Sequence, residues 1–197
     1  MRIAVFGASG KTGRHVVDQG LARGHEVVAF VRGVSRFDAS HELLEVAEGD
    51  ARDPDAVVAA LRGSDAAVSV ISLARPEDEP QHSEATGVIV EVAKAEGTRR
   101  IVVTANNHAF HDDDVPPELA AFAREHRRNR DALRASGLDW TIVASPTLGD
   151  EPGTGSYSAA VDERAGGKRT AREDLATAAL DALGHDDWIG HIVGVSS

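Results

Sequence analysis

Short apolar runs alternate with amphipathic segments along almost the whole of this 197-residue chain. A short apolar run ended by a turn is typical of a buried parallel strand, and apolar residues spaced three or four apart predict a helix. The expected strands span residues 3–6, 26–31, 43–48, 66–71, 100–104, 140–144 and 191–195. The expected helices span residues 11–23, 53–62 and 83–96, a segment ending near 136–137, and residues 170–183. This alternation predicts one doubly wound α/β domain over residues 1–197, with about seven parallel strands and helices on both faces.

Capping residues mark two of the expected helix N-termini. Asp53 precedes Pro54, which suits an N-cap followed by the first helical position. Thr170 and Glu173 have the spacing of a capping box, in which each side chain binds the backbone N–H of the other residue. We therefore expect one helix to begin after Asp53 and another after Thr170.

Charge and cysteine content exclude several classes of function. The chain carries 21 Lys and Arg against 32 Asp and Glu, a formal net charge of −11. That sign repels nucleic acid and anionic membranes, and no apolar run approaches the roughly 20 residues that cross a bilayer. Zero cysteines exclude disulfides and thiolate metal sites. We expect a cytoplasmic protein, a monomer or small homo-oligomer, whose partner is a small molecule.

Residues 7–13 read GASGKTG and admit two interpretations as a nucleotide-binding loop. The letters GKT resemble the end of a P-loop. A P-loop needs a further glycine five residues before the glycine of GKT, and this chain has Val5 there. Gly7, Gly10 and Gly13 instead recur at every third position, between a strand and an amphipathic helix. This spacing is typical of the turn that binds a dinucleotide.

Each glycine of this turn has a physical role. The first permits the tight turn, the second lets backbone N–H groups approach a pyrophosphate, and the third lets the helix pack closely on the strand. The N-terminus of the helix then faces the phosphates with its free N–H groups. A tight turn that binds nothing is the alternative, but the loop follows the first strand and the expected elements come after it. The sequence therefore predicts a Rossmann-type domain.

The residue at the end of the second expected strand selects the dinucleotide. A site that prefers NAD has Asp or Glu there to bind the ribose 2′-OH, whereas this chain has Arg32, with Arg36 four residues later. A guanidinium suits a 2′-phosphate, so we expect NADP(H), the alternative being a solvated surface arginine. Asp50, at the end of the third strand, could accept a hydrogen bond from the adenine amino group or could cap a helix.

Residues for common catalytic mechanisms are missing. Alcohol dehydrogenases of the short-chain class need Tyr-x-x-x-Lys, but the only tyrosine is Tyr157 and the residue four positions later is Val161. No GxSxG nucleophile motif is present. His108, His111 and the aspartates at 112–114 lack a recognised ligand spacing, so we expect an exposed loop there and no metal site.

Two classes of function fit a nicotinamide site without an evident proton donor. The first is hydride transfer to an acceptor that needs little acid catalysis, such as the isoalloxazine ring of a free flavin or a linear tetrapyrrole. The second is a sensor that binds the dinucleotide and carries out no chemistry.

Three motifs in the first half of the chain are similar to those of a known group. GASGKTG, then VRGVSRF, then the GD at 49–50 resemble the NAD(P)H-binding atypical short-chain dehydrogenases, which include NmrA-like proteins. Residues 115–157 are similar to the biliverdin reductase B family of NADPH-dependent flavin reductases, through the VPP, LRxSGL and GDxPxTGxY elements. The similarity runs nearly end to end. It implies an NADPH-dependent flavin reductase-like oxidoreductase, with free flavin as substrate, or an NmrA-like non-catalytic redox sensor.

The resemblance implies a set of contacts, position by position. Contacts with the phosphates are implied for Gly7, Ser9, Gly10, Lys11, Thr12 and Gly13. The 2′-phosphate would be held by Arg32 and Arg36, and the adenine by Asp50 and Ala51. The nicotinamide side would be lined by Ser72, Leu73 and Ala74. The nicotinamide and the acceptor would be surrounded by Thr104, Ala105, Pro146, Thr147 and Leu148.

The chain departs from the family at two acceptor-site positions. The active-site serine of the family falls on Ala105 and its active-site histidine on Thr147. Because those side chains contact the acceptor, their loss puts tetrapyrrole reduction in doubt. Flavin reduction suffers less, since positioning of the ring against the nicotinamide contributes most of the rate. His126 is a further candidate for a polar contact with the acceptor, or else a partly exposed helix histidine.

Overall fold

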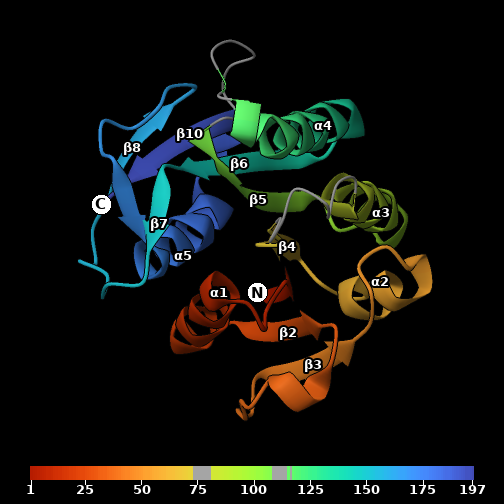
Figure 1. Ribbon diagram of the computed structural model, residues 1–197. Helices are drawn as coiled ribbons and strands as arrows, with labels where there is room; N and C mark the ends of the chain where they lie inside the picture. The colour runs from red at the N-terminus through yellow and green to blue at the C-terminus, as the bar shows by residue number, and fades with distance from the viewer. Residues whose placement is uncertain (73–80, 108–114, 116) are drawn as a thin grey trace.

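The computed structural model describes residues 1–72, 81–107, 115 and 117–197, and its centre is an eight-stranded sheet (Figure 1). Seven strands are parallel, and the eighth, at one edge, runs antiparallel to its neighbour. In spatial order the strands are β3 (Leu44–Glu48), β2 (Glu26–Val31), β1 (Arg2–Phe6), β4 (Ala66–Ser69), β5 (Arg100–Asn106), β6 (Asp139–Ser145), β10 (His191–Ser196) and β8 (Ser158–Val161).

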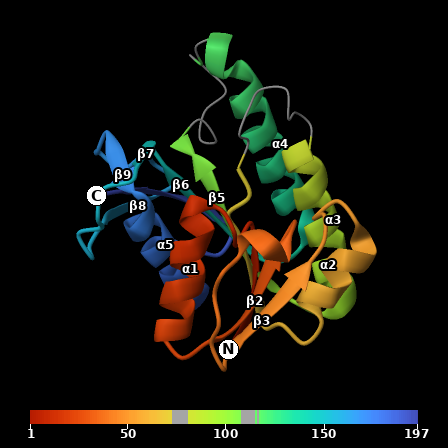
Figure 2. The same ribbon diagram turned by 60° about the horizontal axis from the view of Figure 1, so that its bottom comes forward.

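Helices cover both faces of this sheet, as Figures 1 and 2 show. One face is covered by α1 (Lys11–Ala22) and α5 (Arg172–Asp181). The other is covered by α2 (Pro54–Leu61), α3 (Gln81–Glu96) and α4 (Ala120–Ser136). The prediction of a Rossmann-type doubly wound parallel sheet is therefore confirmed.

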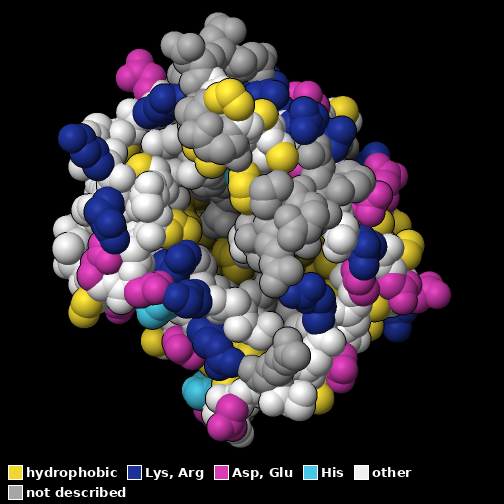
Figure 3. All heavy atoms as spheres, in the orientation of Figure 1, with side chains coloured by type: hydrophobic (Ala, Val, Ile, Leu, Met, Phe, Trp, Pro, Cys, Tyr) yellow, Lys and Arg dark blue, Asp and Glu magenta, His cyan; other side chains and the backbone are white. Residues whose placement is uncertain are grey.

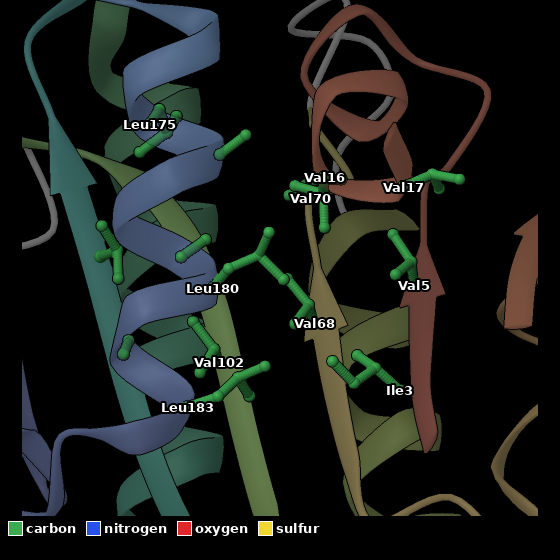
Figure 4. Packing of buried hydrophobic residues seen from close by; sticks show 14 of the residues in the cluster. Ile3, Val5, Val16, Val17, Val68, Val70, Val102, Leu175, Leu180 and Leu183 are labelled. Carbon is green, nitrogen blue, oxygen red and sulfur yellow. The ribbon is translucent and has the colours of Figure 1, made fainter. Parts of the chain in front are cut away.

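The central strands are apolar because the helices bury them from both sides. Residues 3–6 of β1 are fully buried, with alternate side chains in the two layers. Ile3 and Val5 pack with α1 and α5, and Figure 4 shows side chains of these helices directed at β1 and β4. Ala4 and Phe6 belong to the layer beneath α2 and α3. Continuous apolar runs are the expected pattern for such strands.

One of the two predicted helix caps is confirmed and the other is wrong. The backbone N–H of Asp55 donates to Asp53 Oδ1 at 3.1 Å, so Asp53 caps α2 as predicted. At α5 the N-cap is Ala171 and no capping box forms. Thr170 instead donates its hydroxyl to the carbonyl of Val195, and Glu173 accepts the N–H of Gly153. Both side chains form hydrogen bonds with the backbone of other segments and not with the N-terminus of α5.

Three short strands were not predicted from the sequence. β8 pairs with β10 and covers the edge that β10 was expected to form. A separate two-stranded parallel sheet joins β7 (Thr147–Gly149) to β9 (Arg169–Ala171). These strands have only three or four residues, and their sequences TLG, SAAV and RTA lack the long apolar run that identifies a buried strand. Among the described residues, no helix combines the length and apolar character needed to cross a bilayer.

Candidate functional site

Two adjoining cavities lie at the carboxyl ends of the central strands. The first has a volume of about 420 Å³ and lies beside β1, β2 and α3; the second has about 500 Å³ and lies beside β5, β6 and α5. They meet at four shared residues, Gly10, Val70, Ile71 and Ser72. Figure 3 shows the hollow, with Lys and Arg side chains around it. The strand order changes direction between β1 and β4 at this edge of the sheet, and such a switch point is where open α/β sheets bind ligands.

The structure brings most of the predicted site residues to these cavities. Those that line the first cavity are Gly7, Ser9, Gly10, Arg32, Asp50, Ala51 and Ser72. Those that line the second are Gly10, Lys11, Thr12, Ser72, Thr104, Ala105, His126, Pro146, Thr147 and Leu148. Leu73 and Ala74 lie outside the described residues, as does the proposed loop at 108–114. Arg36 ends a short 3-10 turn (Val34–Arg36) after β2, and its side chain is outside the description.

The glycine turn has the geometry that its spacing predicts. Gly7 has a φ of 84°, which favours glycine, and a Cβ on it would lie 3.1 Å from the backbone of Val70 and Ile71. A Cβ on Gly13 would lie only 2.1 Å from the carbonyl oxygen of Gly7. Gly13 is therefore required for α1 to approach β1, and it lines neither cavity as described.

The N-terminus of α1 is open toward the cavities. Its N-cap is Gly10, which supplies no side-chain hydrogen bond, and its first turn contains no acidic residue. Within the described structure, the first amides of this 12-residue helix thus lack a side-chain cap. Such an end attracts anions through its free N–H groups and its dipole. This arrangement suits the pyrophosphate that the sequence predicts.

A second arginine, Arg52, lies in the first cavity with Arg32. Its guanidinium donates to both carboxylate oxygens of Asp50, at 3.0 Å from Nε to Oδ1 and 2.6 Å to Oδ2. Hydrogen bonds from the Arg52 side chain and backbone lower the pKa of Asp50 to about 2. Because Asp53 caps α2, the helix-capping alternative for Asp50 is wrong. Arg52 was not predicted from the sequence, because it belongs to no motif.

A buried polar cluster separates the two cavities on the α3–α4 side. His82 lines the first cavity and His126 the second, and their rings meet edge to face at 5.6 Å. Burial lowers the pKa of His82 to about 4, so this imidazole is neutral at pH 7. The amide Nδ2 of Asn129 lies 3.2 Å from each ring nitrogen of His82. The fully buried carboxylate of Glu125 accepts hydrogen bonds from the backbone and hydroxyl of Ser83. Of this cluster, only His126 was predicted from the sequence.

The only tyrosine serves the fold rather than the site. The hydroxyl of Tyr157 donates to Asp181 Oδ2 at 2.8 Å, at the end of α5. Burial and this carboxylate raise the pKa of Tyr157, so the phenol is a poor proton donor. Tyr157 is not among the described residues that line either cavity. The structure thus agrees with the absence of a Tyr-x-x-x-Lys dyad. Among the described residues, no group of three or more His, Cys, Asp or Glu could hold a metal ion.

The GDEPGTGSY segment is attached to α5 through Asp174. This fully buried carboxylate accepts the N–H groups of Thr154 and Gly155, each at 3.0 Å, and the Thr154 hydroxyl at 3.3 Å. A Cβ on Gly153 would lie 2.7 Å from the same carboxylate, which explains a glycine at this position. These contacts fix the segment that follows β7, the strand whose Leu148 lines the second cavity.

We expect Asp174→Ala to lower the free energy of unfolding by about 2–4 kcal/mol, because it leaves buried N–H groups without an acceptor. Urea denaturation measures this difference. A matched control is Glu91→Ala, which removes an exposed carboxylate on α3. Equal stability of the two variants would contradict the assigned role of Asp174.

The contribution of Asp174 also depends on pH. Burial opposes its ionisation, but hydrogen bonds from Thr154, Ser197 and Gly155 outweigh burial, and its pKa lies below the ordinary value. A lowered folded-state pKa means that the unfolded chain binds the proton first as pH falls. The stabilisation is therefore complete above about pH 4 and is lost on further acidification. We expect the stability difference between wild type and Asp174→Asn to shrink from pH 6 to pH 3, and a constant difference in urea titrations would refute this.

Comparisons with known proteins agree with this geometry. Residues 7–186 match the model of the NAD(P)H-binding family. The chain is 28% identical to the Bacillus subtilis protein YwnB, over 95% of this chain and 94% of that one. It is 32% identical to a 3-diazoavenalumate denitrifying reductase of a Streptomyces species, over 79% of this chain and 58% of that one.

A solved structure shares the fold over its full length. It is a candidate NADH-flavin reductase from Streptococcus pneumoniae, with a TM-score of 0.83, 23% identity, and coverage of 100% of this chain and 99% of that one. At that identity the likeness shows the fold alone. Together with the family match, the glycine turn and the open helix N-terminus lead to one conclusion. The chain belongs to the NAD(P)H-binding family.

Proposed function

We propose that this protein is an NADPH-dependent oxidoreductase that transfers hydride to a free flavin. The observation that carries the proposal is the pair of cavities joined at Gly10 and residues 70–72. The first has the size and the charged groups for an adenosine phosphate, and the second is an open space of about 500 Å³ for nicotinamide and acceptor. A dinucleotide crossing the shared residues would present its nicotinamide in the second cavity.

The charge in the first cavity supports NADPH over NADH. Arg32 lines it at the end of β2, where NAD enzymes have a carboxylate. The only carboxylate among the described lining residues is Asp50, and Arg52 binds both of its oxygens. A phosphate on the ribose would accept charge-assisted hydrogen bonds from these arginines. A hydroxyl at the same position would form weaker hydrogen bonds with them.

The second cavity supports an acceptor that needs no strong acid from the protein. Ala105 and Thr147 lie in its wall, and Tyr157 is held away by Asp181. A flavin ring can take hydride at N5 from C4 of the nicotinamide, while solvent supplies the proton. The protein contributes positioning of the two rings, which is a large part of the rate in cofactor enzymes. The alternative is an NmrA-like sensor, which would bind the dinucleotide in the same way without turnover.

Oxidation of NADPH in the presence of riboflavin tests the proposal. Absorbance at the reduced-nicotinamide band would fall faster with enzyme than without it, under anaerobic conditions and with flavin in excess. No turnover above the uncatalysed rate, together with tight NADPH binding, would remove the reductase and leave the sensor.

A further inference from the structure

One carboxylate at the rim of the second cavity holds two cations. Lys11 Nζ lies 2.5 Å from Asp150 Oδ2, and Arg172 Nε donates to Asp150 Oδ1 at 2.7 Å. The three residues begin α1, follow β7 and begin α5, so three separate elements meet here. Lys11 and Arg172 line the cavity, and Asp150 does not.

The charge of this cavity differs from that of the molecule as a whole. Among its described lining residues, the ones that can carry charge are Lys11, His126 and Arg172, and none is a carboxylate. The chain has a net charge of −11. The two carboxylates next to Arg172 bind elsewhere, since Glu173 accepts the N–H of Gly153 and Asp174 accepts those of the next two residues.

The arginine is held in place and the aspartate is accessible. The side chain of Arg172 is 24% exposed, whereas that of Asp150 is 58% exposed. Hydrogen bonds from Lys11 and Arg172 keep the pKa of Asp150 below its usual range, so it is ionised at neutral pH. An exposed carboxylate between two cations can be replaced by another anion at little cost, because the ion pairs that it makes are partly screened by water.

We propose that Lys11 and Arg172 form a subsite for an anionic group, phosphate or carboxylate, on the electron acceptor, with Asp150 as its resident counter-ion. The inference rests on the proposed function and adds a preference among acceptors. A neutral acceptor leaves the ion pairs intact. An anionic acceptor competes with Asp150 and gains charge-assisted hydrogen bonds from the guanidinium.

The dinucleotide is a second source of the same chemistry, because its pyrophosphate could also reach these cations. The two sources give different results for Arg172→Gln. If the subsite serves the acceptor, NADPH affinity stays the same and acceptor selectivity is lost. If it serves the pyrophosphate, NADPH affinity falls and the selectivity among acceptors does not change, and the proposal is overturned.

FMN and riboflavin make a direct probe, since they share the isoalloxazine ring and differ in the phosphate. Their equilibrium binding to the NADP⁺-saturated protein is measured by quenching of flavin fluorescence. We expect wild type to bind FMN about tenfold tighter, the scale of one charge-assisted contact, and Arg172→Gln to bind both equally. Asp150→Asn is expected to raise the preference for FMN further, because it removes the competing carboxylate. A merely structural role of Asp150 would weaken both flavins alike.

Arg169→Gln is the matched control. Arg169 lies on β9, pairs with Glu151 at 3.3 Å, and is not among the described residues that line the cavity. It should leave the FMN preference at the wild-type value. Equal binding of FMN and riboflavin by wild type, or no FMN binding, would overturn the subsite. Turnover is scored separately: equal riboflavin and FMN rates and affinities keep the reductase and remove the subsite. FMN-selective binding without turnover would keep the subsite and remove the reductase.

Discussion

Replacing Gly13 by alanine is expected to abolish dinucleotide binding and to lower the free energy of unfolding by about 1–3 kcal/mol. The added Cβ would lie 2.1 Å from the carbonyl oxygen of Gly7 and 2.8 Å from the Cα of Ala8. Both neighbours are backbone atoms, so the strain cannot be relieved by rotating a side chain. The turn must move away from α1. The free N–H groups of the turn and of the helix would then no longer converge on the expected position of the pyrophosphate.

Calorimetric titration with NADPH and urea denaturation measure the two effects of Gly13→Ala. Gly87→Ala is the control, because Gly87 lies in α3 and a Cβ on it meets nothing within 4 Å. That variant should bind NADPH normally and be as stable as wild type or slightly more so, since alanine favours helix. Wild-type binding by Gly13→Ala would show that the close approach of α1 to β1 does not build the site.

The second large effect is expected for Arg32→Asp, which should weaken NADPH binding by about 1–3 kcal/mol, roughly ten- to a hundredfold. Arg32 lies at the end of β2 in the first cavity, and the substitution replaces a cation by an anion beside the expected 2′-phosphate. NADH carries a hydroxyl at that position, and a carboxylate can accept its hydrogen bond. The NADH affinity should therefore stay constant or rise.

The ratio of the two dissociation constants is the decisive quantity for Arg32. Arg62→Asp makes the same change of charge at an exposed position after α2, with a side chain 76% exposed, and should leave the ratio unchanged. If both arginine variants lower NADPH affinity equally, the effect is one of overall charge. The assignment of Arg32 to the 2′-phosphate would then be wrong.

The parts of the fold that depend on apolar burial could be predicted from the sequence. β1, β2 and β10 were expected because strands buried on both faces must be apolar throughout, and β2 was placed at its observed bounds. The glycine turn was predictable for a similar reason. Only glycine fits where a backbone carbonyl lies 2.1 Å from the place of a Cβ. In both cases the pattern that reveals the constraint lies within one short stretch of the chain.

Features that depend on contacts between distant segments could not be predicted in this way. Thr170 and Glu173 match a capping box, but in the structure they bind Val195 and Gly153, which the sequence does not place nearby. Arg52 joins the first cavity through its pairing with Asp50, in a short turn with no motif. His82 is buried and contacts Asn129 and His126 of α4, and no property of residues 81–84 alone indicates that.

The residues that belong to sequence motifs were predicted to lie near one another, whereas contacts outside the motifs were not predicted. Ten predicted residues line the second cavity, because strand ends and the segments after them converge at one edge of a parallel sheet. Lys11 lies within the glycine turn, as the sequence requires, yet its ammonium is paired with Asp150. Its contact with a pyrophosphate stays a prediction. The ion pair joins residues 139 positions apart, beyond the reach of any local pattern.

The joined cavities are expected to hold a nicotinamide dinucleotide with its 2′-phosphate beside Arg32. Calorimetric titration of the purified protein with NADPH, NADP⁺ and NADH measures this binding. We expect one site per chain and a dissociation constant at least about tenfold lower for NADPH than for NADH, the value of one charge-assisted hydrogen bond. No heat of binding from any of the three coenzymes would contradict it.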